Sequence, residues 1–283
     1  MPRYIILLFA FVFLMGGISF AQTQAQLDSL KTAYYKALHT TPQRIDSEME
    51  ADRNRPRIPD TVHYAFPHRY KTTALPAIFE TAFFALSSVM QDSIKFIFCA
   101  VDIGKLNSET GRIIACAGPV IYDQKPFVQQ FPIGQFPVQL SVATFDKQER
   151  IAFSRICFSD SPVVRWEFAL DSGQKQLPLF GKKAYSYGVD GGIGMFLDAE
   201  AGQAYNELEK PDTVFFDRRI TDEMDKHDHL SWQYGIYSFQ GHNVAAFTSG
   251  WGDGHYSTYV GYDKDGQICR LLTDFGLITW WKK

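Results

Sequence analysis

Cysteine is scarce in this chain, with four in 283 residues, and none of the four lies in a C-x-x-C pair. Without closely spaced cysteines the sequence excludes zinc-finger modules, and a chain of this length can build its core without disulfides. Each cysteine lies in an apolar, strand-like run, where a buried free thiol is expected. If a bridge forms, the predicted pair is Cys99 and Cys116, which lie in neighbouring predicted strands joined by a turn-rich connection.

A large excess of charge is also missing. The chain has 28 basic and 31 acidic side chains, so its formal net charge is −3. This balance gives no electrostatic reason to bind nucleic acid or an anionic membrane, and we expect no nucleic-acid partner. The hydrophobic content of 46% and the aromatic content of 15% exclude a disordered chain, a collagen-like repeat and a long coiled coil.

Long apolar runs are absent except at the N-terminus. There, Arg3 precedes the apolar run Tyr4–Met15, and small residues at Ser19 and Ala21 fit a cleavage site. We therefore predict that residues 1–21 form a signal peptide and that the protein is exported to the periplasm or the extracellular space. After cleavage we expect no membrane contact, because no later segment has 18 apolar residues in a row. Retention of this segment as an anchor is the alternative.

Residues 22–92 are predicted to be a partly helical lead-in. Apolar residues recur at steps of three and four residues and would form one face of an amphipathic helix: Leu27, Leu30, Tyr34 and Leu38. A second short helix is predicted within 75–90, after Pro76. From residue 93 to the C-terminus the pattern is that of a single β-rich domain.

The β-rich part predicts an α+β fold, mainly an antiparallel sheet or sandwich with a few short helices. Two alternating runs at 136–145 and 150–158 are separated by a short polar turn, which predicts a hairpin. A helix is predicted over 199–209 with Asp198 as its N-cap, and a polar helix over 219–230. Strands with tight turns are predicted to follow to the C-terminus.

Two glycine-rich segments carry the candidate site. They are the octapeptides 187–194 and 249–256, in which glycines allow backbone conformations closed to other residues. The candidate ligand-binding residues are Asp190, Trp251, Asp253, His255 and Tyr256. Of these, Asp190, Asp253 and His255 are also the candidate catalytic residues, because a carboxylate and an imidazole can transfer protons. The alternative is a structured turn in which Asp253 binds backbone groups of its own loop.

Two weaker patterns are compatible with metal ligation. His227-Asp228-His229 lies near a predicted helix end with polar neighbours, where a solvated helix end is expected. Asp263-Lys264-Asp265-Gly266 resembles the start of a calcium loop but lacks the closing glutamate, so a hairpin turn is expected. We predict neither a metal nor a cofactor for this chain.

Several blocks of the chain resemble the bacterial domain of unknown function 4241 family. The blocks occur in the family's order over roughly residues 95–275: GRIIACAGPVIY, FPIGQFPVQL, FSDSPVVRWEFAL, YGVDGGIGMFLDAEA and SGWGDGHYSTYVGYDKDGQICRLLTDF. The resemblance implies the extent of the domain. It implies no activity and no catalytic residue, because the family has no established function.

These observations predict a non-enzymatic binding module whose recognition edge is formed by the two glycine-rich segments. Aromatic and acidic side chains together suit a small ligand, a sugar or a peptide, because apolar faces stack while acids fix orientation. A hydrolase using Asp190, Asp253 and His255 is the first alternative, and a protein–protein interaction domain is the second. The oligomeric state stays open.

Overall fold

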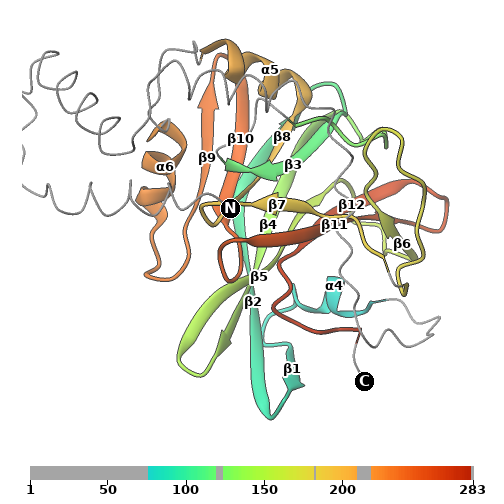
Figure 1. Cartoon of the computed structure of the whole chain (residues 1–283), viewed down its shortest axis with the longest axis vertical. Coiled ribbons are helices and arrows are strands. Elements are labelled where there is room, and N and C mark those ends of the chain that lie inside the picture. The colour runs from blue at the N-terminus through green and yellow to red at the C-terminus, as the bar shows by residue number, and fades with distance from the viewer. Residues whose placement is uncertain (1–75, 119–123, 182, 209–217, 282–283) are drawn as a thin grey trace, which may run out of the picture. The chain divides into compact units, whose positions relative to one another are not determined.

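The fold is built from antiparallel strands in two sheets. The computed structural model describes residues 76–118, 124–181, 183–208 and 218–281 (Figure 1). The predicted signal peptide and most of the predicted lead-in lie outside these residues. Every strand pair between the named strands is antiparallel, which confirms the predicted β-rich class.

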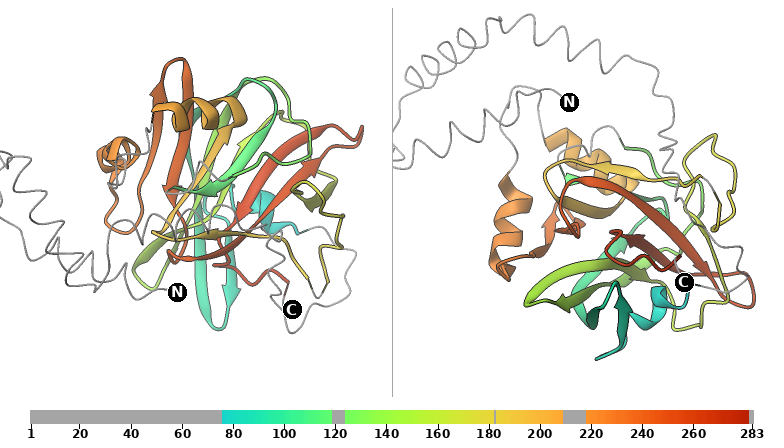
Figure 2. Two further views of the ribbon diagram at one scale, coloured as in Figure 1. Left: turned by 45° about the horizontal axis from the view of Figure 1, so that its top comes forward. Right: turned by 60° about the horizontal axis from the view of Figure 1, so that its bottom comes forward.

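The large sheet has eight strands. In spatial order they are β1 (Ser88–Gln91), β2 (Ile94–Ser108), β4 (Gly134–Phe145), β5 (Gln148–Cys157), β12 (Ile268–Asp274), β11 (Gly254–Tyr262) and β6 (Arg165–Phe168), with β7 (Tyr187–Val189) paired to β11. The small sheet has the order β3 (Ile113–Ala117), β8 (Ile193–Asp198), β10 (His242–Thr248) and β9 (Tyr234–Phe239). The sheets curl into a half-barrel (Figure 2).

Three apolar clusters hold these layers together. The first lies between the sheets and includes Leu140 of the large sheet and Phe247 of the small sheet. The second covers the opposite face of the large sheet, where Phe79 of the short helix α4 (Ile78–Thr81) packs against Tyr259. The third lies under the helices α5 (Ala199–Leu208) and α6 (Arg218–Met224), on the outer face of the small sheet. A 3₁₀ turn, η2 (Asp225–His227), follows α6.

The hairpin predicted between 136–145 and 150–158 is confirmed as β4 and β5. Asp146 and Lys147 form its turn with positive φ angles of 43° and 64°. Paired left-handed residues twist a two-residue turn in the same sense as the strands it joins. The alternation along β4 places Val138 and Leu140 in the core between the sheets.

The predicted N-cap is confirmed. Asp198 Oδ1 accepts a hydrogen bond from the backbone N–H of Glu200 at 3.1 Å, in the first turn of α5. This satisfies one of the donors that every helix N-terminus leaves without an intrahelical partner. The predicted polar helix over 219–230 is present as α6 and η2, and it ends at His227.

The helix predicted within 75–90 is shorter than expected. Only Ile78–Thr81 is helical, and β1 begins at Ser88. Leu86 adopts a positive φ of 61°, which a continuing helix cannot contain. The chain turns there because the backbone N–H of Leu86 and the carbonyl of Ser87 both bind Phe98 of β2.

The candidate bridge between Cys99 and Cys116 is wrong, because all four cysteines are free thiols. Cys99 lies on β2 of the large sheet, whereas Cys116 lies on β3, which leaves that sheet and pairs with β8. Burial of the thiol is confirmed for Cys116 and Cys269, while Cys99 is exposed. Consecutive strands of the chain therefore belong to different sheets here.

Stability is expected to fall in alkaline solution. Burial raises the pKa of the Cys116 thiol and of the Tyr187 phenol well above their ordinary values of 9.0 and 10.0. Both groups lose their protons more readily in the unfolded chain, so stability is complete below about pH 8 and declines from about pH 9 upward. Urea unfolding across this range, with reductant present, measures the decline. Cys116→Ala combined with Tyr187→Phe should flatten it, and an unchanged slope would contradict this cause.

No helix among the residues that the structure describes is long and apolar enough to cross a bilayer.

Candidate functional site

The structure brings the two glycine-rich segments together. Strands β7 and β11 pair, and the loops beside them meet in backbone contacts. Gly192 O accepts a hydrogen bond from the N–H of Ser249 at 2.9 Å. A Cβ added at Gly192 would lie 3.5 Å from the Cα of Gly252. These loops can approach so closely because both residues have positive φ angles, 69° at Gly192 and 101° at Gly252.

Asp253 joins one loop to the other. Its Oδ1 accepts a hydrogen bond from the N–H of Gly191, 62 residues earlier in the chain, at 2.7 Å. As the alternative to a functional role, the sequence predicted that Asp253 would stabilise the turn of its own loop. The hydrogen bond of its side chain instead crosses to the other glycine-rich loop. The side chain is exposed, and a carboxylate accepts about four hydrogen bonds, so Asp253 retains capacity for a ligand.

Tyr256 lies beneath the loops rather than at their surface. Its side chain is buried, and its hydroxyl donates a hydrogen bond of 2.7 Å to the carbonyl of Gly252. The ring packs edge-on against Phe275, with centroids 5.1 Å apart. Ser249 Oγ also donates to the Gly252 carbonyl, at 2.9 Å. Tyr256 therefore supports the backbone of the loop from inside.

Trp251 is the large apolar residue that this region exposes, with 57% of its surface accessible to solvent. Two neighbours hold it: Phe145 packs edge-on at 5.7 Å between centroids, and the guanidinium of Arg150 lies 5.5 Å from the ring centroid. Both supporting residues flank the β4–β5 turn. Neither residue was predicted to belong to the site, because their proximity to Trp251 depends on the pairing of distant strands.

Asp190 and His255 are exposed beside the same loops. Asp190 precedes Gly191, whose N–H binds Asp253. His255 is the cross-strand neighbour of Gly188, and a Cβ added at Gly188 would be 3.5 Å from the imidazole Cε1. Asp190, Trp251 and Asp253 thus reach the surface from two adjoining loops and His255 from the start of β11, while Tyr256 supports that surface from below.

The two weaker patterns have structural roles. The imidazole of His229 stacks on Trp232 at 4.0 Å, and that of His227 stacks on Tyr234 at 4.6 Å. Within the described ranges, no three side chains of His, Cys, Asp or Glu are grouped as a metal site.

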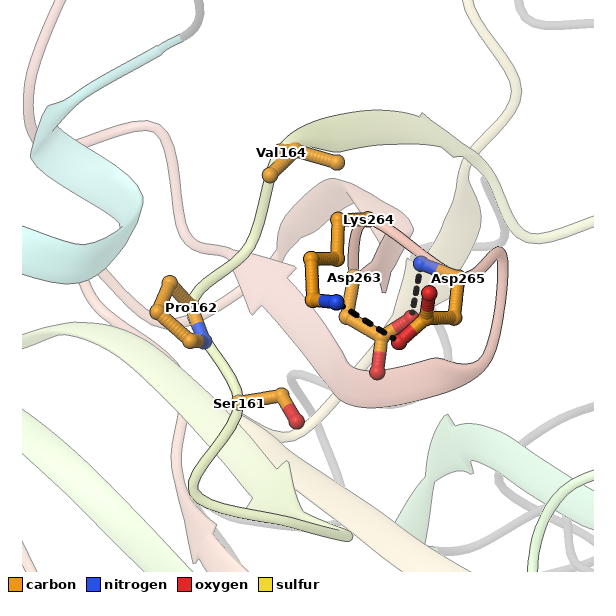
Figure 3. A pocket seen from close by; sticks show the side chains of 6 residues that line it. All are labelled: Ser161, Pro162, Val164, Asp263, Lys264 and Asp265. Atoms are coloured by element: carbon orange, nitrogen blue, oxygen red, sulfur yellow. Dashed lines mark hydrogen bonds and ion pairs between the residues drawn. The ribbon is translucent and has the colours of Figure 1, made fainter.

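The hairpin turn expected at 263–266 is present between β11 and β12. Asp263 Oδ1 accepts N–H bonds from Asp265 and Gln267, both at 2.9 Å, and these bonds lower the pKa of Asp263. The turn borders a surface hollow of about 110 Å³ (Figure 3).

One family model matches the chain. Its description is "Protein of unknown function (DUF4241)", and it covers residues 106–273, which include both glycine-rich loops. No curated protein and no solved structure matches the chain. The comparisons therefore give a family and the extent of its domain, without an activity.

Proposed function

The chain belongs to the DUF4241 family of proteins of unknown function, and from the geometry of its glycine loops we propose that it is an exported binding module. Its ligand, a sugar or a peptide, stacks on Trp251. The observation that carries the proposal is the 57% exposure of this ring on a backbone that is fixed from several sides. An exposed aromatic ring on a rigid loop offers contact area at a small cost in conformational entropy.

Polar groups around the ring support the choice of ligand. Asp253 lies two residues after Trp251, and Asp190 precedes Gly191, whose N–H binds Asp253; both carboxylates are exposed and can accept hydrogen bonds from sugar hydroxyls or peptide amides. The Arg150 guanidinium occupies one side of the indole, so stacking is proposed on the side that remains accessible. The predicted export agrees with this role, because a signal peptide at residues 1–21 would bring the chain to the periplasm or the extracellular space, where free sugars and peptides are available as ligands.

Binding to an oligosaccharide array and to a peptide array, followed by calorimetric titration of the strongest binder, tests the proposal. We expect Trp251→Ala to weaken binding by about tenfold or more, because the stacked face is lost. Trp251→Phe should retain most of the affinity. The control is Leu86→Ala, a change at an exposed apolar residue just before the edge strand β1. This variant should bind like the wild type.

Two results would overturn the proposal. If Trp251→Ala binds as the wild type does, the ring does not contact the ligand. If the bound oligosaccharide is shortened and His255→Ala abolishes the cleavage, the protein is the alternative hydrolase, with His255 as proton carrier. Thermal unfolding of each variant separates these outcomes from a loss of folding.

A further inference from the structure

The ring of Trp251 is held by a residue that is itself held in place. The guanidinium of Arg150 lies 5.5 Å from the centroid of this ring. Arg150 Nη1 in turn donates a hydrogen bond of 2.9 Å to the carbonyl of Ser231. Ser231 belongs to the loop 228–233 between η2 and β9, which we call the bridging loop. One contact of the ring therefore depends on a loop outside the two glycine-rich segments.

Two further hydrogen bonds fasten the bridging loop to the start of β5. Ser231 Oγ donates to the carbonyl of Glu149 at 2.8 Å, and Trp232 Nε1 donates to the carboxylate of Glu149 at 3.0 Å. The side chain of Trp232 is buried in the cluster between the sheets, so the direction of its N–H is fixed by packing. Glu149 and Arg150 are consecutive residues. The bonds to Glu149 therefore also hold the backbone from which Arg150 extends.

The end of the bridging loop is joined to the strand that leads to Trp251. The N–H of Gln233 donates to Thr248 Oγ1 at 2.9 Å, and the N–H of Thr248 donates to the carbonyl of Gln233 at 3.0 Å. Thr248 is the last residue of β10 and precedes the glycine-rich loop that carries Trp251. The contacts thus form a closed circuit, from Trp251 through Arg150 and the bridging loop to Thr248, and along the backbone back to Trp251.

We infer that Glu149 and Trp232 are positioning residues of the ligand site, which hold the bridging loop and, through Arg150, fix the orientation of Trp251. The inference rests on the proposed function, since this orientation affects binding only if Trp251 contacts the ligand. A ring that is already held in its binding orientation loses little conformational freedom when the ligand arrives. Loss of the bond between Trp232 and Glu149 should therefore weaken binding by about threefold, which is less than the loss of Trp251 itself.

Trp232→Phe tests the first positioning residue, because it removes the indole N–H and keeps an aromatic ring in the core. The matched control is Trp280→Phe. Trp280 Nε1 donates to Asp274 Oδ2 at 2.7 Å and lies beside the second apolar cluster, so the control loses the same atoms and a similar bond elsewhere in the fold. We expect Trp232→Phe to bind about threefold more weakly and Trp280→Phe to bind like the wild type.

A pair of variants at Glu149 tests the second positioning residue. Glu149→Gln and Glu149→Ala remove the same negative charge, but only glutamine retains a side-chain oxygen that can accept the indole N–H. Glu149→Gln should therefore keep the affinity of the wild type, while Glu149→Ala should lose about threefold. Equal affinities of the two variants would overturn the inference, because the effect would then not depend on the hydrogen bond.

Fluorine NMR of the chain labelled with 5-fluorotryptophan reports on the ring without any ligand. The chain has five tryptophans, and each signal is assigned by its Trp→Phe variant. We expect the Trp251 signal to shift or broaden in Trp232→Phe and in Glu149→Ala, and to keep its position in Trp280→Phe and in Glu149→Gln. A Trp251 signal that stays unchanged in all four variants would contradict the positioning role.

These measurements separate the failure of the inference from the failure of the proposed function. If no oligosaccharide or peptide binds the wild type, the proposed function is wrong, and the Trp251 signal alone supports or overturns the orientation of the ring by these residues. If a ligand is lost in Trp251→Ala but binds Trp232→Phe and Glu149→Ala with full affinity, the positioning role is wrong and the proposed function stands. Thermal unfolding checks that each variant is folded.

Discussion

Glu80→Ala is expected to cost the protein about 3–5 kcal/mol of folding stability, because the change leaves two buried guanidinium groups without their shared carboxylate. Glu80 Oε1 lies 3.2 Å from Arg155 Nη1 and 3.4 Å from Arg270 Nε. Arg155 and Arg270 are only 8% and 7% exposed. The three charges fasten helix α4 to neighbouring strands β5 and β12 of the large sheet.

Other contacts make this cluster depend on Glu80. Gln139 Oε1 accepts two hydrogen bonds from Arg155, at 3.0 and 2.8 Å, and the Arg155 guanidinium lies 3.8 Å from the ring centroid of Phe83. Burial lowers the pKa of Arg155, and the charge of Glu80 acts in the opposite direction. These neighbours hold the guanidinium in place, so it cannot turn to water when the carboxylate is removed.

Urea unfolding of Glu80→Ala measures the loss. A matched control is Glu167→Ala, which breaks the more exposed ion pair between Glu167 and Arg165, and we expect it to cost about 1 kcal/mol or less. Equal effects of the two variants would show that the buried cluster does not stabilise α4. A drop in melting temperature of roughly 6–20 °C should accompany the loss at Glu80.

Asp198→Ala has the second large expected effect, about 3–5 kcal/mol, because four hydrogen-bond donors lose one buried acceptor together. The side chain is fully buried. Its Oδ2 accepts the N–H groups of Glu109 and Thr110 at 3.1 and 3.0 Å, and its Oδ1 accepts the Thr110 hydroxyl at 2.8 Å and the N–H of Glu200 at 3.1 Å. One carboxylate thus joins the turn after β2 to the start of α5.

The control for this variant is Asp228→Ala. Asp228 is exposed and accepts one backbone bond, from Leu230 at 3.0 Å, so we expect its replacement to cost about 1 kcal/mol or less. Asp198→Asn should fall between the two, because it retains one acceptor oxygen. Faster amide hydrogen exchange at Glu109, Thr110 and Glu200 in Asp198→Ala would locate the loss, and unchanged exchange there would contradict the assigned role.

The candidate site shows which features of a binding surface can be predicted from the amino-acid sequence. The glycine pattern of 187–194 and 249–256 selected both loops, because only glycine readily adopts the backbone angles that a close approach requires. The bond from Gly191 to Asp253 and the support of Trp251 by Arg150 were not predictable. These contacts join segments that are far apart in the sequence, and no local pattern encodes their meeting.

Local order was determined by the sequence itself: the alternating run that forms β4, the β4–β5 turn, and Asp198 as the cap of α5. These features depend on interactions among neighbours in the chain, which periodicity and turn chemistry record. Only the tertiary structure decided that β3 leaves the sheet of β2, which separates Cys99 from Cys116. It also decided that Asp198 holds a turn 88 residues away and that Glu80 forms ion pairs with two distant arginines. A buried charge or donor is satisfied by whatever the fold brings near it, so its partner is a property of the packing rather than of the local sequence.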